Sequence, residues 1–266
     1  MDKILIFIPM YNCEKQIPRV IAKIAALGDE QRRFSEVLVV DNRSTDGSLA
    51  AAVEAIRCLR IPAKVVRNCK NYSLGGSHKV AFGYALDHDF DFVAVLHGDD
   101  QGDISDLLPL LRDGKHLQFD SLLGARFLPQ SKLYHYSRFR IFGNRVFNAF
   151  VSLCTGQRVS DLGAGLNLYQ TAYLRSRFYL PFPNDLTFNV YLLLYGIYVR
   201  SRFCFFPLSW REEDQVSNAK LWSQTKRMLG LVGHYVFHKK TVFSTLENEQ
   251  SAMDYRFEVI AAHAGE

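Results

Sequence analysis

The stretch that most constrains this chain is FVAVLHGDDQGD, residues 92–103, where five apolar residues run directly into acidic ones. An apolar run of this length with β-branched residues predicts a buried strand. Open α/β sheets bind ligands at the carboxyl ends of their strands, so Asp99, Asp100 and Gln101 are candidates to hold a metal-bound phosphate. The alternative is an acidic turn in which Asp103 caps the following helix.

Two earlier apolar runs end in the same way. LIFIPMYN ends a strand at Pro9, and EVLVVDNRSTDG ends another at Asp41, with Asp46 in the turn that follows. Strand and helix patterns then alternate every few tens of residues, which predicts an α/β fold with a mostly parallel central sheet, right-handed crossovers and flanking helices. Three such strand ends on one sheet predict one cleft.

The patterns predict a definite set of elements. Strands are expected at 4–8, 37–40, 63–67, 92–96, 121–125 and 198–206, with a further strand after the turn at 161, and helices at 17–27, 49–59, 77–86, 104–111, 137–155, 185–195 and 218–238. In helix 137–155 we expect the phenylalanines to pack and the arginines to face solvent or substrate. Residues 241–266 are expected to be a helical or frayed tail.

The predicted helix 218–238 gathers basic and polar side chains on one narrow face, namely Lys220, Gln224, Arg227, His234 and His238. One interpretation is an amphipathic C-terminal helix that lies on an anionic membrane, with peripheral contact through 218–240. The other is a helix that closes the core or forms a contact in a homo-oligomer.

The net charge of +5 is unevenly distributed along the chain. Lys and Arg against Asp and Glu number 13 to 15 in residues 1–110, 18 to 7 in 111–240 and 1 to 5 in 241–266. The basic second half predicts anionic partners there. Because no helix-turn-helix, zinc-finger or RNP-like pattern accompanies the arginines, we exclude nucleic acid.

The composition predicts a globular intracellular protein. Close to half of the 266 residues are apolar, which is enough for one large core. Five widely spaced cysteines without a C-x-x-C pair indicate reduced thiols and argue against a disulfide framework or a zinc site. We expect no signal peptide and no membrane span, hence a cytoplasmic location, peripheral at the inner face of the membrane if the acceptor is a lipid.

Seven motifs in order resemble one family. IPMYN, DNRSTDG, NYSLGGSHKVAFGYA and LHGDDQGD are similar to the nucleotide-sugar half of a family 2 inverting glycosyltransferase of the GT-A fold. GARF, RIFGN and DLGAGLNLY are similar to the polyprenyl-phosphate (dolichyl-phosphate) sugar transferase branch. The resemblance covers roughly residues 4–221. It implies a domain at 1–217, with a nucleotide-sugar half at 1–110 and an acceptor half at 111–217, and a C-terminal helical extension at 218–266.

The resemblance implies transfer of a sugar from a nucleotide diphosphate sugar to a polyprenyl-phosphate or glycan acceptor, with Mn²⁺ or Mg²⁺ as cofactor. The family writes its metal motif Asp-x-Asp-x-Gln, and here His97 stands at the first aspartate and Asp99 at the second. A neutral imidazole binds Mn²⁺ better than Mg²⁺. Either His97 is a ligand and the metal is Mn²⁺, or Asp99, Asp100 and Gln101 bind the metal without it.

Donor-binding candidates follow the strand ends. Pro9, Tyr11 and Asp41 are candidates for the base and ribose socket, although Asp41 is alternatively a turn-former. The other candidates are Asp46, Asn71, Lys79, Asp99, Arg211 and Ser217, the last two on a segment that in the family closes over the donor. The glycine-bearing loop before Lys79 lacks G-x-G-x-x-G, so it is either a turn that brings the helix N-terminus to the nucleotide or a cap without a ligand.

Catalytic and acceptor candidates come from the second half. In the family an acid stands just before the helix at 185–195, which makes Asp185 the first candidate for a general base and Asp161 the second; the alternative for Asp185 is a helix cap. By the same resemblance Arg126, Arg138 and Arg140 bind an anionic acceptor.

Two other functions remain open from the sequence. A sugar-nucleotide pyrophosphorylase shares the layered architecture, but it would carry a glycine-rich basic signature after the first strand, where IPMYNCEKQIP stands. A non-catalytic nucleotide-binding or scaffold subunit would explain His97 in place of an acid.

Overall fold

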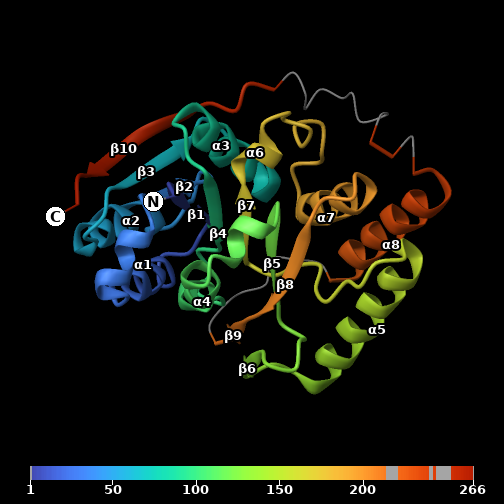
Figure 1. The fold of residues 1–266 in the computed structure, drawn as a ribbon. Helices are drawn as coiled ribbons and strands as arrows, with labels where there is room; N and C mark the ends of the chain where they lie inside the picture. Colours follow the sequence, from blue (N-terminus) through green and yellow to red (C-terminus); the bar gives the residue numbers. More distant parts are fainter. Residues whose placement is uncertain (1, 214–220, 240–241, 244–252, 266) are drawn as a thin grey trace.

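The computed structural model describes residues 2–213, 221–239, 242–243 and 253–265. Its centre is a mixed sheet in the order β10-β3-β2-β1-β4-β7-β5-β8 (Figure 1). The strands are β1 Ile4–Met10, β2 Glu36–Asp41, β3 Ala63–Asn68, β4 Phe92–Leu96, β5 Ser121–Ala125, β7 Leu166–Gln170, β8 Phe203–Pro207 and β10 Phe257–His263. A second small sheet pairs β6, Lys132–Tyr134, with β9, Ser209–Arg211.

Helices cover both faces of this sheet. They are α1 Ile17–Ala25, α2 Ser48–Ala55, α3 Ser73–Asp87, α4 Leu108–Arg112, α5 Arg138–Thr155, α6 Thr171–Leu174, α7 Phe188–Tyr198 and α8 Leu221–Phe237. Short 3₁₀ turns, η1 Gly28–Arg33, η2 Ile56–Cys58, η3 Ile104–Leu107 and η4 Lys115–Gln118, join them. One core lies between the sheet and α1, α2 and α4; the other lies between the sheet and α3, α6, α7 and α8.

The predicted parallel sheet is confirmed for its first half. β3, β2, β1 and β4 are neighbours and parallel, as helix-linked apolar strands require. β7 is different, because it runs antiparallel between β4 and β5. This reversal turns the chain back before α7, so the second half of the sheet is mixed.

The C-terminal region differs from the sequence prediction in part. The expected amphipathic helix is present as α8, and its buried Leu231, Val232 and Tyr235 close the core. The expectation of a helical or frayed tail is wrong for residues 257–263, which form β10 along the edge of β3. The segment FEVIAAH contains β-branched and aromatic residues, which favour a strand, and β3 would otherwise be an unpaired sheet edge. Both explain why this segment forms a strand.

The packing expected for α5 is wrong in part: its arginines are exposed as predicted and Phe147 packs against the core, but the other phenylalanines do not. Phe139 and Phe142 are 84% and 68% exposed. The helix is attached to the protein through its other side, where Asn148, Val151 and Thr155 are buried. The sequence could not show which side faces inward, because both sides of α5 carry apolar residues.

Close packing between β5 and its neighbours makes Gly124 a sensitive position. A Cβ at Gly124 would lie 2.4 Å from the backbone oxygen of Leu166 and 2.6 Å from Cδ1 of Leu208. We expect Gly124→Ala to lower the free energy of unfolding by about 1–3 kcal/mol, because the backbone of β7 cannot yield. Urea unfolding of this variant measures the loss.

Gly143→Ala is the matched control for this prediction. It lies inside α5, where an added Cβ meets nothing within 4 Å. We expect it to be neutral or to stabilise by up to about 1 kcal/mol through helix propensity. Equal destabilisation by both substitutions would contradict the packing argument.

Candidate functional site

The carboxyl ends of β2, β1 and β4 lie side by side. Met10 at the end of β1 is in register with Asp41 at the end of β2. On the other side of β1, the backbone N–H of Gly98 donates to the carbonyl of Pro9 at 3.1 Å. A Cβ on Gly98 would lie 2.9 Å from that same oxygen, so only glycine allows the two strand ends to meet. Three of the predicted donor-binding segments therefore share one edge.

Asp41 lies fully buried where the donor socket was predicted. It accepts a hydrogen bond from the backbone N–H of Ser44 at 3.0 Å, and its other oxygen lies 3.1 Å from Nε of Arg67. The turn-forming and charged roles thus coexist in one carboxylate. Tyr11 is exposed on the adjoining loop, at the same edge.

Asp46 has a local role in the loops around this edge. Its carboxylate accepts from the backbone N–H and the hydroxyl of Ser48, at the start of α2, and from the backbone N–H of Glu14. Asn12 joins the same loops by accepting from the backbone N–H of Thr45. Asp46 therefore holds the loops after β1 and β2 together.

Sequence reasoning missed a buried amide at this edge, Asn42. Its Oδ1 accepts from Nδ2 of Asn68 and from the backbone N–H of Tyr72, while its Nδ2 donates to Oδ1 of Asn71. Asn42 thus fixes the loop that precedes α3, and it brings Asn71 to the end of β2. The residue directly follows Asp41, so its place after the strand was the available signal.

The acidic residues after β4 have separate environments. The Asp99 side chain accepts from the backbone N–H of Gln101 at 3.2 Å and stays partly exposed. Asp100 instead is buried and turned toward α1, with a φ of 63° and ion pairs at 2.7 Å to Arg19 and Lys23. The expectation that Asp100 shares the metal is therefore not supported, because α1 already neutralises its charge.

His97 lies beneath the neighbouring loop. Its backbone N–H donates to the carbonyl of Gly165, and a Cβ on Gly165 would lie 2.9 Å from the His97 ring. Burial lowers the pKa of His97, which leaves the imidazole neutral. Its Nε2 is buried and has no hydrogen-bond partner among the described residues.

These residues fit a metal that is held mainly by its substrate. No group of three or more His, Cys, Asp or Glu side chains within the described ranges could hold an ion alone. A hard cation bound to a diphosphate needs only one or two protein carboxylates, since phosphate oxygens and water fill the other positions. Asp99 can supply that carboxylate, and the neutral Nε2 of His97 would suit a transition metal as a second ligand.

The segment after β8 reaches the same place from the second half. The backbone N–H of Arg211, at the end of β9, donates to the carbonyl of Gln101 at 3.0 Å. The Arg211 side chain lies over the ring of Tyr134 and pairs with Glu213. The predicted donor contact at Ser217 lies outside the described residues.

Arg126 and Asp161 form a buried ion pair. Nε and Nη2 of Arg126 donate to the two carboxylate oxygens at 2.7 and 2.8 Å, and the backbone N–H of Arg126 donates as well. The guanidinium lies between the rings of Phe127 and Trp210, about 5 Å from each. Burial alone would raise the pKa of Asp161, but Arg126 holds it below its usual value.

This pair changes two predicted roles. Asp161 is an ionised partner of an arginine, which makes it a poor general base. The Nε and Nη2 donors of Arg126 are already used by Asp161, so they are not available to bind an anionic acceptor. The two residues that were predicted separately act as one structural unit.

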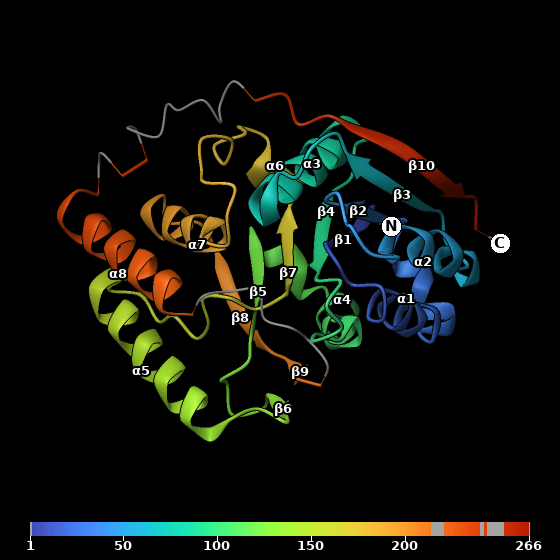
Figure 2. The same ribbon diagram turned by 180° about the vertical axis from the view of Figure 1, so that it is seen from behind.

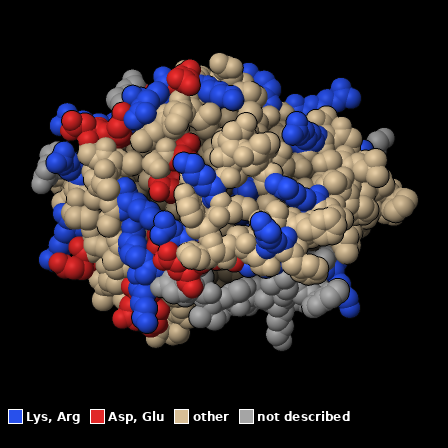
Figure 3. Space-filling model, turned by 90° about the horizontal axis from the view of Figure 1, so that it is seen from below, with Lys and Arg blue, Asp and Glu red and all other residues tan. Residues whose placement is uncertain are grey.

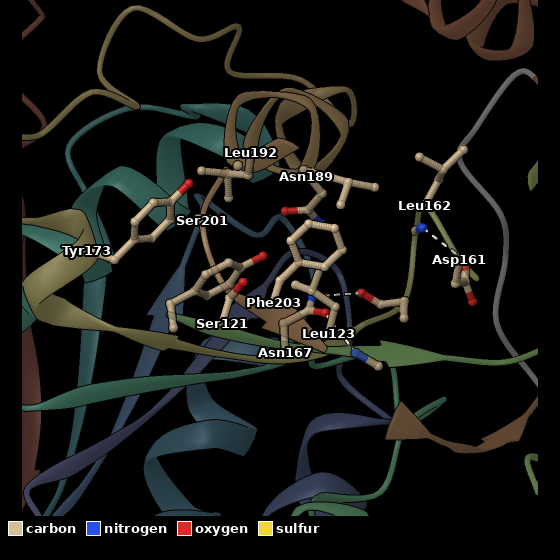
Figure 4. Close-up of a pocket in the computed structure, with 16 residues that line it drawn as sticks. Ser121, Leu123, Asp161, Leu162, Asn167, Tyr173, Asn189, Leu192, Ser201 and Phe203 are labelled. Carbon is tan, nitrogen blue, oxygen red and sulfur yellow. Dashed lines mark hydrogen bonds between the residues drawn. The ribbon is translucent and has the colours of Figure 1, made fainter. Parts of the chain in front are cut away.

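A small cavity lies between the Asp161 loop and α7 (Figure 4). Its volume of about 30 Å³ suits a water molecule. The side-chain oxygen of Asn189 reaches it without a hydrogen-bond partner in the part of the chain that the structure describes. A buried water there would satisfy this oxygen.

Asp185 lies at the turn before α7. Its Oδ1 accepts from the backbone N–H of Thr187 at 2.8 Å, and its Oδ2 pairs with Arg227 of α8 at 2.8 Å. The alternative prediction of a helix cap is wrong, because the N-cap of α7 is Thr187 and Asp185 closes the turn before it. The carboxylate remains partly exposed. The role of general base stays a prediction.

Lys79 does not face the nucleotide edge. It is buried, and its ammonium donates to the carbonyl of Phe182, to Oδ1 of Asn184 and to the hydroxyl of Tyr255. The predicted donor contact is wrong, because the side chain is turned toward the loop before α7. It links α3 to the segment that carries Asp185.

The other two acceptor arginines lie on α5. Arg140 pairs with Glu212 at 2.6 Å and covers the ring of Tyr136. Arg138 is exposed at the start of the helix. Arg126 and Arg140 lie near the same Tyr136 and Glu212; burial raises the pKa of Tyr136, and both arginines oppose that rise. Of the three predicted acceptor arginines, the structure therefore brings these two together.

The comparison with protein families decides the classification. Residues 5–178 match the family model described as glycosyl transferase family 2. The chain belongs to this family.

Two curated relatives act on polyprenyl carriers by name. The undecaprenyl-phosphate 4-deoxy-4-formamido-L-arabinose transferase of Sodalis glossinidius is 26% identical over 170 residues, which is 64% of this chain and 49% of that protein. The polyprenol monophosphomannose synthase of Mycolicibacterium smegmatis is 22% identical over 173 residues, 65% and 63% of the two chains. The chain thus spans about half to two thirds of the length of these relatives.

Solved structures support the fold. The glucosyl-3-phosphoglycerate synthase of M. tuberculosis, in complex with Mn²⁺ and UDP-glucose, gives a TM-score of 0.62 at 15% identity over 88% of this chain and 79% of that one. S. aureus TarS 1-349 with UDP-GlcNAc gives 0.57 at 19% identity over 95% and 73%. The predicted α/β fold of GT-A type is confirmed.

Burial of Lys79 predicts a pH dependence of stability. Burial lowers its pKa to about 7, whereas a lysine in an unfolded chain has a pKa of about 10.4. Between these values the unfolded state binds more protons, so the free energy of unfolding rises with pH, by at most ~1.4 kcal/mol per pH unit. Lys79→Met should remove this rise in urea unfolding at pH 7, 8.5 and 10.

The control for this prediction is Lys15→Met, on an exposed turn. It should keep the wild-type slope over the same range. A slope that Lys79→Met leaves unchanged would show that the buried ammonium stays charged.

Proposed function

We propose that the chain is a metal-dependent, inverting glycosyltransferase that moves a sugar from a nucleotide diphosphate sugar to the phosphate of a polyprenyl carrier. Family membership supports the transferase class, and the names of the relatives suggest the lipid acceptor. The observation that carries the proposal is the meeting of Asp99 and Gln101 with the ends of β1, β2 and β9.

The donor half of the reaction follows from these strand ends. Tyr11, which is exposed at this edge, would contact the base and ribose. Asp41 would accept from ribose hydroxyls or a base imide once donor binding uncovers its buried carboxylate, which is now paired with Arg67. A bound divalent cation would supply charge neutralisation for the departing diphosphate. Asp99 would hold it, with His97 Nε2 as a second ligand if the ion is Mn²⁺. The contact between Arg211 and Gln101 keeps this loop in place.

The ion pairs of the two candidate bases support a phosphate as the acceptor. Asp161 is paired with Arg126, and Asp185 is paired with Arg227. A sugar hydroxyl must lose a proton during transfer, which requires an available base. A phosphate acceptor arrives already ionised and needs none. The two ion pairs therefore favour phosphate over a glycan hydroxyl.

The proposal places the chain at a membrane surface during catalysis. None of the helices within the described residues is long and apolar enough to cross a bilayer. A polyprenyl phosphate is held in a membrane by its tail, so the chain would contact that membrane from one side, the cytoplasmic one by the sequence expectation.

Asp99→Asn tests the donor site. We expect transfer to be lost and metal-dependent binding of nucleoside diphosphate to disappear, because the amide lacks the charge that holds the ion. Radiolabelled sugar transfer and a thermal-shift titration of UDP with Mn²⁺ measure the two effects.

Asp103→Asn is the control for the donor-site test. Asp103 caps the turn at Ser105, and asparagine keeps that hydrogen bond. This variant should retain activity and UDP binding. Normal turnover by Asp99→Asn would refute the metal assignment.

Asp185→Asn separates the two classes of acceptor. With a phosphate acceptor kcat should fall by less than about tenfold, whereas removal of a general base should cost about 10²-fold or more. Asp87→Asn, an exposed carboxylate paired with Arg177, controls for the loss of an ion pair. A much larger loss at Asp185 than at Asp87 would favour a hydroxyl acceptor.

A further inference from the structure

The outer side of α5 carries an apolar stripe. Phe139, Phe142 and Leu153 are 84%, 68% and 84% exposed, and Val146 and Phe150 are exposed as well. At 100° per residue these five side chains fall within an arc of about 80°. They form one continuous strip along the helix.

The orientation of α5 is opposite to that of a helix in a soluble core. Its buried side includes Asn148 and Thr155, whose side chains bond to the backbone at Ser160 and Val151. Each large apolar side chain left in water forgoes about 1.5–3 kcal/mol of burial. A contiguous exposed strip of this kind marks a binding surface.

The neighbouring helix α8 also carries exposed apolar side chains. The two helices lie side by side at one end of the molecule in both ribbon views (Figures 1 and 2). While Leu231, Val232 and Tyr235 of α8 point into the core, Leu229, Val236 and Phe237 remain exposed. We call the eight exposed apolar residues of α5 and α8 the outer face.

The charge of the outer face is one-sided. Neither 138–155 nor 221–237 contains an aspartate or glutamate. Arg138 and Arg145 of α5 and Lys226 of α8 are exposed beside the apolar side chains. Figure 3 shows basic groups scattered over tan surface on the side where α5 lies, with acidic groups mainly on the opposite side.

We propose that the outer face docks the protein on an anionic lipid membrane, with the α5 strip in the acyl boundary and the basic side chains at the headgroups. This combination is typical of interfacial helices. A second copy of the chain is disfavoured, because a symmetric contact would place arginines against arginines without an acidic partner on either helix. The inference deepens the proposed function, on which the identity of the lipid substrate rests.

A groove runs beside the outer face, between α5 and the segments 127–129 and 156–160. It has a volume of about 760 Å³ and is lined by Arg145 and Leu153 of α5, by Arg158 and by Phe127. Phe127 stacks on Arg126 at the end of β5. A lipid tail and phosphate entering from the membrane would meet apolar walls with two guanidinium groups, at the side of the molecule where α5 docks.

Vesicle sedimentation tests the docking surface. We expect the protein to bind vesicles containing 30% phosphatidylglycerol in phosphatidylcholine at low salt. The double variant Phe139→Ser/Phe142→Ser should lower the partition coefficient about tenfold or more. Arg138→Ala and Arg145→Ala should each lower it about fivefold, and only with anionic vesicles.

Matched controls keep the test specific. Leu117→Ser removes a 55% exposed leucine from η4, and Arg57→Ala removes an exposed arginine from η2. Both should bind vesicles like the wild type. Circular dichroism should show all variants folded, since the changed side chains are exposed.

The outcomes separate this inference from the proposed function. UDP binding in the absence of lipid should be the same in wild type and outer-face variants. Intact UDP binding without vesicle binding would overturn the docking surface alone, and vesicle binding without UDP binding would overturn only the proposed function. A concentration-dependent dimer in sedimentation velocity, abolished by Phe139→Ser/Phe142→Ser, would overturn the membrane in favour of a second copy.

Discussion

The ion pair between Arg126 and Asp161 is the interaction on which the second half of the structure depends. It ties the end of β5 to the loop before β7, and the ring of Trp210 in β9 packs against the Arg126 guanidinium. Breaking such a buried pair from one side leaves an uncompensated charge, which typically costs 3–5 kcal/mol. β9 in turn holds the loop that carries Asp99, through the contact of Arg211 with Gln101. A pair outside the chemistry thus supports the residue proposed to hold the metal.

Sequence patterns predicted the first half of the fold because its information is local. Continuous apolar runs such as 92–96 can only be buried strands when helices flank them, and parallel pairing follows. β7 escaped this reasoning, since nothing in LNLYQ distinguishes a parallel from an antiparallel neighbour. The outward orientation of α5 escaped it as well, because apolar residues occur on both of its sides and the partner surface is set by distant residues.

The sequence predicted which residues lie at the site when they directly follow strands. It did not predict which partners the long or charged side chains bind. Asp41, Tyr11 and Asp99 lie at the expected edge. Asp100 stands next to Asp99 in sequence, yet its positive φ turns it toward α1. Lys79 lies on α3, whose N-terminus is near the site, but its long side chain places the ammonium against Oδ1 of Asn184 instead. Such choices depend on charges and carbonyls a hundred residues away, which no local pattern contains.

The pairing of β10 with β3 has a consequence for biosynthesis. β3 is complete at residue 68, whereas its outer neighbour begins at residue 257. At a synthesis rate of about 5–20 residues per second, the edge of β3 stays uncovered for roughly ten to forty seconds after it emerges. A nascent edge with unpaired N–H and C=O groups can template association with other chains. Chaperone occupancy of the newly made chain should therefore persist until the 257–263 segment is available to pair with β3.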